Sequence, residues 1–257
     1  MRASNAERFI SISQMPAAAS SWAKIGGVKM AILIACEESQ AVTSAFRRHG
    51  IEAYSCDTED CSGVHPEWHI RRDVREILHD KWDAIIAFPS CTYLTVAGNR
   101  WFSEARYGEA AVERKRLRIE AVEFVRMIWD SNDRVCIENP LGCLGRLWRR
   151  STQTVHPYFF GDADSKRTCL WLKNLPRLKR THFDVKPKIY GYLEKGKHAG
   201  NPIYFHDSKL PDADRAKIRS ATFPGVAEAM AAQWAEWITA GNRNERQLSL
   251  DFNQIPH

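Results

Sequence analysis

Residues 82–94 read Trp-Asp-Ala-Ile-Ile-Ala-Phe-Pro-Ser-Cys-Thr-Tyr-Leu. The first half is a short apolar run with β-branched residues, the pattern of a strand buried on both faces of a parallel sheet. Pro89 should end this strand, because proline lacks the N–H that a sheet ladder needs. Cys91 is therefore expected on the loop at the carboxyl end of a central strand, where open α/β sheets bind ligands. A thiol there is placed like a nucleophile, and the alternative is a buried structural cysteine.

A second apolar run leads to another set of polar residues. Residues 134–140 read Arg-Val-Cys-Ile-Glu-Asn-Pro, which again predicts a short strand that stops near a proline. Glu138 and Asn139 should then project from the same sheet edge as Cys91. The sequence thus predicts a thiol and a carboxyl group at one edge, a pairing suited to nucleophilic catalysis with acid assistance.

These two segments resemble the DNA cytosine-5 methyltransferases. In that family one strand ends in Pro-Pro-Cys with the nucleophile and a later one in Glu-Asn-Val, where this chain has Pro89-Ser90-Cys91 and Glu138-Asn139-Pro140. The chain is most similar to a short, phage-type branch of DNA methylases. The segments shared with that branch are 34–37, 91–94, 138–140 and 165–172, and the resemblance spans roughly 30–237.

The resemblance implies an α/β, Rossmann-like fold of the S-adenosylmethionine-dependent methyltransferase type, with a mostly parallel sheet and helices on both faces. It implies methyl transfer from S-adenosylmethionine to carbon 5 of a cytosine flipped out of DNA. The thiolate of Cys91 would add to carbon 6 of the ring, which makes carbon 5 nucleophilic. Glu138 would hold a proton at N3, so its pKa should be raised by a dry pocket. Asn139 would orient the loop.

On the cofactor side, the turn before the first helix corresponds to a glycine-rich turn of the family that holds the methionine part of S-adenosylmethionine. The contacts implied here are Cys36, Glu37, Ser39 and Pro89. The turn has no glycine, so it must hold its ligand differently. Glu38 and, more plausibly, Ser39 could instead cap the helix expected over 40–49.

Two aspartates follow later strands. Asp57 ends the strand expected over 51–56, where Rossmann-like folds place an acidic residue against ribose hydroxyls, with Glu59 and Asp60 as weaker contenders. Asp73 corresponds to a family residue that contacts adenine, and it equally suits the cap of a helix over 74–78.

Basic residues provide the DNA contacts that the resemblance implies. Arg100 lies in the loop 95–107, which in the family closes over the flipped base. Lys166 and Arg167 stand where the family touches the target base and its phosphates. A small target-recognition insertion is expected over 173–211, where basic and aromatic residues suit phosphate contact and stacking, with a plain surface loop as the alternative.

Two long helices should cover the sheet. The helix over 109–129 has an apolar stripe, and its outer basic residues are expected to be solvated: Arg114, Lys115, Arg116 and Arg118. The helix over 225–237 should bury Val226, Met230, Trp234 and Trp237.

Composition sets the broad class. The chain has 257 residues, 44% hydrophobic and 26% charged, which fits one α/β domain with a small appendage. The net charge of +6 is compatible with a DNA partner. No apolar run approaches the roughly 20 residues of a membrane span. Seven scattered cysteines favour a reducing cytoplasm, and the resemblance implies that of a bacterial or phage-infected cell. No metal is expected, because Cys56, Cys61, His65 and His69 match no zinc spacing.

We expect a flexible leader over 1–28, a methyltransferase domain over 29–239 and a disordered tail over 240–257. The tail resembles the peptide by which bacterial replication and repair proteins dock on the sliding clamp. The alternatives are that Leu250 and Phe252 fold back onto the protein's own surface, or that the match is chance. The residues that fill that pattern are Gln247, Leu248, Leu250 and Phe252.

Two other functions remain open at this point. A related Cys–Glu enzyme could modify pyrimidines with a different group or at the nucleotide level. A catalytically inactive DNA-binding relative is the other alternative, which the intact Cys91 and Glu138 disfavour.

Overall fold

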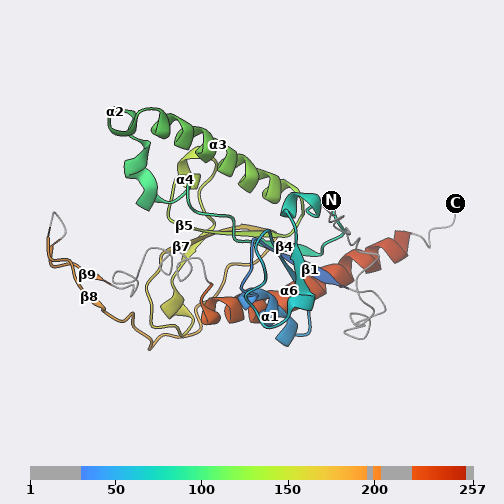
Figure 1. The fold of residues 1–257 in the computed structure, drawn as a ribbon. Helices are drawn as coiled ribbons and strands as arrows, with labels where there is room; N and C mark the ends of the chain where they lie inside the picture. The colour runs from blue at the N-terminus through green and yellow to red at the C-terminus, as the bar shows by residue number, and fades with distance from the viewer. Residues whose placement is uncertain (1–29, 196–198, 204–221, 253–257) are drawn as a thin grey trace, which may run out of the picture.

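The computed structural model describes residues 30–195, 199–203 and 222–252, and of Ala97 and residues 241–252 it describes only the backbone. Seven strands form one sheet in the order β3-β2-β1-β4-β5-β7-β6. Helix α3 (Glu109–Asp130) covers one face, and α1 (Ala41–Arg48) and α6 (Pro224–Phe252) cover the other (Figure 1). The predicted α/β, Rossmann-like fold with a mostly parallel sheet is confirmed.

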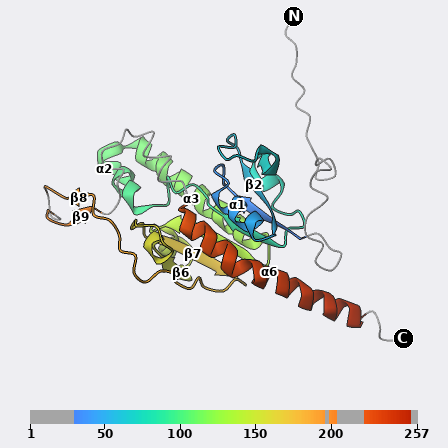
Figure 2. The same cartoon turned by 90° about the horizontal axis from the view of Figure 1, so that it is seen from below.

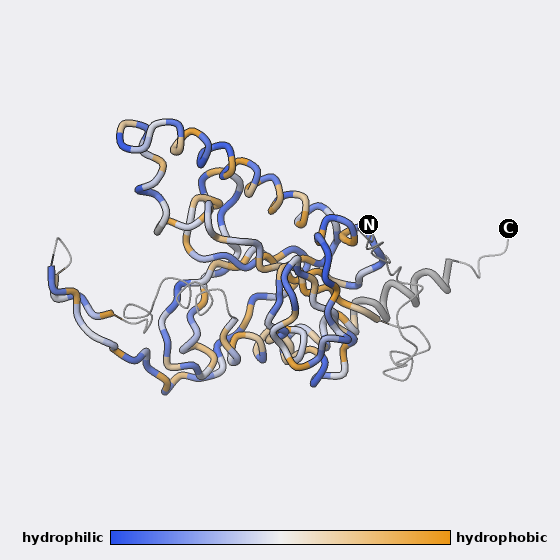
Figure 3. Tube along the Cα trace, viewed as in Figure 1, coloured by the Kyte–Doolittle hydropathy of each residue, from blue (hydrophilic) through white to orange (hydrophobic). Residues whose placement is uncertain are grey.

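Five neighbouring strands pair in parallel, from the edge strand β3 inward to β5: β1 (Ala31–Ala35), β2 (Glu52–Asp57), β3 (His69–Arg71), β4 (Ala84–Ala87) and β5 (Val135–Pro140). Strands β1 and β4 are wholly apolar in sequence because helices cover both faces (Figure 3). From β1 the chain builds β2 and β3 on one side, and then returns to build β4 on the other. The carboxyl ends of β1 and β4 therefore mark the topological switch point, where open α/β sheets bind ligands.

One strand of the sheet, β7, runs in the opposite direction to the others. Strand β7 (Thr168–Lys173) runs antiparallel to β5, and β6 (Gln153–Val155) pairs with its outer side. In this register Thr168 lies opposite Pro140. The residues just before β7, including Lys166, are thereby brought to the carboxyl end of β5.

The helices bury one stripe each. Val226, Met230 and Trp234 of α6 are buried as predicted, on the face where α6 meets α1 (Figure 2). The prediction for Trp237 is wrong: its side chain is 52% exposed, with the indole Nε1 donating to the carbonyl of Asn174. Steps of four residues from Val226 lead to Ile238, which takes the buried place instead.

Helix α6 continues to Phe252, so the predicted disordered tail is wrong for the backbone up to that residue. Gly241 weakens a helix by only about 1 kcal/mol, and the Glu, Arg, Gln and Leu residues that follow are good helix formers. The side chains of the clamp-binding pattern lie outside the described residues, as do the leader and the end of the chain. Within the described part, no helix is long and apolar enough to cross a membrane.

The predicted insertion contains a small hairpin, β8 (Gly191–Tyr192) with β9 (Pro202–Ile203), which projects from the body (Figure 1). The chain leaves the body where the N–H of Lys188 donates to the carbonyl of Ala163. It is tied down again where the N–H of Gly225 donates to Asp162. The two attachment points are thus adjacent residues.

Candidate active site

A cavity of about 850 Å³ opens at the topological switch point. The sequence-predicted residues that line it are Cys36, Glu37, Ser39, Asp57, Asp73, Pro89, Cys91, Glu138, Asn139 and Lys166. Arg100 and Arg167 do not line it, and both are exposed. The structure therefore brings the expected catalytic and cofactor residues together and leaves two of the expected DNA contacts on the surface.

Cys91 lies on a tight turn after β4. Its carbonyl accepts hydrogen bonds from the N–H groups of Leu94 and Thr95, both at 3.0 Å. The thiol is half-buried and lines the cavity. This is the loop position that the sequence predicts.

Glu138 lies near the end of β5, the strand beside β4. Burial raises the pKa of its carboxyl group, while the Lys166 ammonium and the Thr168 hydroxyl offset part of that rise. The predicted rise in pKa is confirmed. A carboxyl group that keeps its proton can donate a hydrogen bond inside the cavity.

Asn139 joins the two strands at this edge. Its side chain is 1% exposed, and Nδ2 donates to the carbonyl of Pro89 at 2.8 Å. Pro89 is two residues before Cys91, so the amide fastens the start of the Cys91 loop to β5. This contact agrees with the expectation that Asn139 orients the loop.

The loops after β4 and β5 are joined by their backbones as well. The N–H of Cys143 donates to the carbonyl of Leu94 at 2.8 Å, and the N–H of Val96 donates to the carbonyl of Leu141 at 3.2 Å. The approach is possible only because residue 142 is glycine: a Cβ there would lie 2.0 Å from the Leu94 oxygen. The loops that carry Cys91 and follow Glu138 therefore form one unit.

Two arginines of α3 support the Cys91 loop from the other side. Arg114 and Arg118 donate to the carbonyls of Thr92 and Tyr93. The expectation that they form a solvated face is wrong, because residues 92–102 fold back over this part of the helix. The expectation holds for Lys115 and Arg116, which are exposed and pair with glutamates.

On the cofactor side, Glu37 makes the turn after β1 possible without glycine. Cys36 and Gln40 adopt left-handed φ values of 58° and 59°, which non-glycine residues rarely do. The Glu37 carboxylate accepts from the N–H of Val42 at 2.6 Å, and from the N–H and hydroxyl of Thr43 at 3.2 and 2.6 Å. Burial raises its pKa from 4.5 to about 7.

Glu37 rather than Ser39 or Glu38 therefore caps α1, and both of its carboxylate oxygens are engaged. The alternative roles considered for Ser39 and Glu38 as caps are wrong. Glu37 precedes the helix by more than the single residue of a standard N-cap, which explains why spacing alone does not reveal it.

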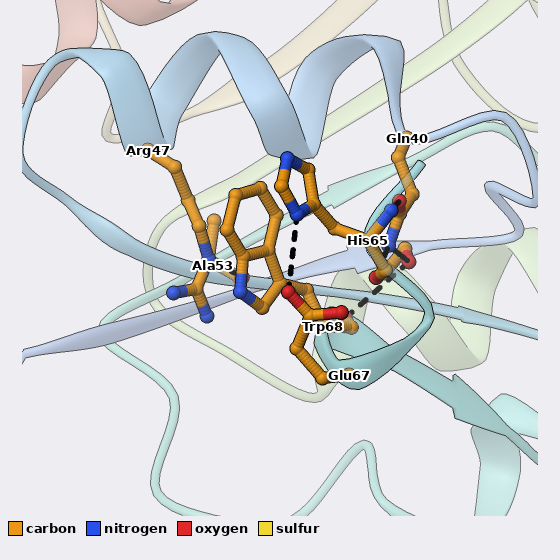
Figure 4. A network of polar contacts seen from close by, with 7 residues as sticks. Gln40, Arg47, Ala53, His65, Glu67 and Trp68 are labelled. Atoms are coloured by element: carbon orange, nitrogen blue, oxygen red, sulfur yellow. Dashed lines mark hydrogen bonds and ion pairs between the residues drawn. The ribbon is translucent and has the colours of Figure 1, made fainter. Parts of the chain in front are cut away.

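Gln40, the residue before α1, anchors the loop that follows β2. Its side chain is 1% exposed and bonds to His65 in both directions, with Nε2 donating to the carbonyl at 2.7 Å and Oε1 accepting from the N–H at 3.1 Å. The His65 ring stacks on Trp68 at 3.6 Å, with Arg47 beside the indole at 4.4 Å (Figure 4). The sequence analysis missed this anchor.

The two aspartates differ in how much of each carboxylate is occupied. Asp73 caps the short helix η4 (Val74–Glu76). Its Oδ1 accepts from the backbone N–H of Arg75, and its Oδ2 accepts from the guanidinium group of the same residue. The capping role that the sequence allowed is confirmed. Asp57 uses Oδ1 in a local turn with Glu59.

Among the described residues, no group of three or more His, Cys, Asp or Glu side chains could hold a metal ion. Comparison of the chain with models of known protein families finds no match, and comparison with curated proteins finds no significant match. The geometry of the cavity is therefore the guide to what this protein does.

Proposed function

We propose that this protein transfers a methyl group from S-adenosylmethionine to carbon 5 of cytosine in DNA. The observation that carries the proposal is the pairing of Cys91 with Glu138 in one cavity, at the ends of adjacent strands. A half-buried thiol that lines the same cavity as a carboxyl group of raised pKa can supply a nucleophile and a proton donor for one substrate.

In this mechanism the Cys91 thiolate forms a bond to carbon 6, and the electrons of the 5,6 double bond become available at carbon 5. The Glu138 proton is hydrogen-bonded at N3 and stabilises the charge that develops on the ring. S-adenosylmethionine, when bound, would supply the methyl group to carbon 5 and leave as S-adenosylhomocysteine. Transfer of the carbon 5 proton to water then restores the double bond and expels the thiolate.

The cofactor side of the cavity fits a cationic nucleoside better than a nucleoside phosphate. The N-terminus of a helix normally attracts phosphate through its free N–H groups. At α1 the Glu37 carboxylate already accepts from the N–H groups of Val42 and Thr43. Further carboxyl groups line the same wall, from Glu38, Asp57 and Asp73. A sulfonium cation with a ribose suits this lining, with Asp57 at the ribose end.

The excess positive charge of the chain favours a polyanionic substrate. Residues 173–195 contain seven Lys or Arg and two Asp or Glu, a net charge of +5 compared with +6 for the whole chain. This segment begins at the end of β7 and reaches into the projecting hairpin. Such a concentration of charge suits a DNA backbone more than a free nucleotide.

The test is covalent capture on DNA that contains 5-fluorocytosine, in which fluorine blocks release of the carbon 5 proton. The wild type should form an adduct only with the methyl donor present. Cys91→Ala should form none, while Cys143→Ala, which removes another half-buried thiol at the same edge, should keep it. Absence of adduct in the wild type, or an undiminished adduct in Cys91→Ala, would refute the proposal.

A further inference from the structure

The Cys91 loop is held by a forked contact from α3. Arg118 donates from Nε to the carbonyl of Tyr93 at 2.8 Å and from Nη2 to Oδ1 of Asn99 at 3.0 Å. Arg114 donates from Nη2 to the carbonyl of Thr92 at 3.0 Å. The two backbone acceptors are the first and second residues after Cys91.

Aromatic rings fix both guanidinium groups in place. The Arg118 guanidinium carbon lies 3.3 Å from the centre of the Phe102 ring, and that of Arg114 lies 5.0 Å from the Tyr93 ring and 5.2 Å from the Phe102 ring. Planar stacking of this kind is specific to arginine, because a lysine ammonium offers neither the plane nor the fork.

The same helix provides a matched contrast. Arg116 lies between the two on the sequence, but its side chain is exposed and its partners are Glu113 and Glu120 of α3 itself. Removing Arg116 changes the charge of the helix by the same amount as removing Arg118, without touching the loop.

We propose that Arg118, assisted by Arg114, is a positioning residue that sets the Cys91 thiol for addition to its substrate. The proposal rests on the proposed function of Cys91 as a nucleophile. Because the fork joins Tyr93 to Asn99, the turn that carries Cys91 and the short helix η5 (Val96–Phe102) are fastened to one point on α3. The nucleophile is therefore held ready before substrate arrives, rather than brought in by closure of the loop.

The first arm of the test measures thiol alkylation by iodoacetamide in the full-length protein without DNA, followed by peptide mass spectrometry. Arg118→Ala should free the turn and raise the alkylation rate of Cys91 several-fold. Cys136, which is fully buried in β5, should stay protected and serves as the internal control for folding. Arg116→Ala should leave both rates unchanged.

The second arm measures adduct formation with 5-fluorocytosine DNA. Since a misplacement of about 1 Å can lower a rate about 10²-fold, Arg118→Ala should slow adduct formation by roughly 10- to 100-fold. The KM for S-adenosylmethionine should stay within about twofold, because Arg118 makes no bond to the turn over residues 36–40. Arg118→Lys should recover part of the rate by restoring one of the two donors. Loss of positioning is therefore recognised when Cys91 is alkylated faster by iodoacetamide but forms its adduct with DNA more slowly.

An unchanged Cys91 alkylation rate in Arg118→Ala would overturn the proposal, as would adduct formation at the wild-type rate. If Arg118→Ala also exposes Cys136, Arg118→Lys and Arg114→Ala are judged by the same two criteria. A wild type that forms no adduct would refute the proposed function, while the alkylation arm would still decide whether Arg118 holds the loop.

Discussion

Replacing Gly142 with alanine should separate the two halves of the catalytic edge. The added Cβ would lie 2.0 Å from the carbonyl oxygen of Leu94, whereas ordinary contacts begin at 3.4 Å. The two loops must therefore move apart by more than 1 Å, and a displacement of that size can lower a catalytic rate about 10²-fold. The hydrogen bonds from Cys143 to Leu94 and from Val96 to Leu141 are also at risk, at about 1 kcal/mol each.

Gly145→Ala is the control, because a Cβ at that position meets nothing within 4 Å. The assay is the single-turnover rate of methyl transfer to DNA, together with thermal unfolding of each variant. Gly142→Ala should be slowed by one to two orders of magnitude and should unfold several degrees lower, while Gly145→Ala should match the wild type. If Gly142→Ala turned over within threefold of the wild type, the joined loops could not be what sets the geometry of the site.

Three further predictions concern carboxyl groups. Glu138→Gln should keep the fold but lower kcat by about 10²–10⁴-fold. Wild-type activity should decline as the pH rises through the raised pKa of Glu138, because the proposed mechanism requires its protonated form; a flat pH profile would contradict this. Burial raises the pKa of Glu37 from its ordinary value of 4.5 to about 7 in the folded protein. The stabilisation that this group contributes is therefore complete at a pH below 4.5 and is lost as the pH rises through about 7. The unfolding free energy of the wild type should therefore fall by on the order of 3 kcal/mol between these values relative to Glu37→Gln, measured by urea titration at several pH values. Asp57→Ala should raise the KM for S-adenosylmethionine about tenfold or more, as expected for loss of a charged hydrogen bond, whereas Asp73→Ala should mainly lower stability by about 1 kcal/mol through loss of its cap.

The sequence predicts those features that depend on one strand or on its end. Continuous apolar runs predict β4 and β5, and their prolines place Cys91 and Glu138 at one edge. The raised pKa of Glu138 follows from that placement, because the end of a central strand faces a cavity that is partly closed to water.

What the sequence misses depends on contacts between distant segments. The helical period of α3 assigns Arg114 and Arg118 to the outer face, and only the fold shows that residues 92–102 cover them. The Glu37 cap requires two left-handed residues, Cys36 and Gln40, for which side-chain type gives no signal. The prediction for Trp237 is wrong for a smaller reason. A helical period of 3.6 residues places Trp237 and Ile238 almost equally close to the buried stripe, and only the fold shows that Ile238 is the buried one.

The attachment of the projecting hairpin has a consequence for how this protein can diversify. The chain leaves the body beside Ala163 and is bonded to it again at Asp162, and between these points β8 and β9 form a separate two-stranded sheet. Doubling the length of such an excursion adds only about 0.6 kcal/mol of closure entropy. No described residue between Lys188 and Ile203 lines the cavity, so longer, shorter or foreign hairpins could be exchanged there without changing the walls of the cavity.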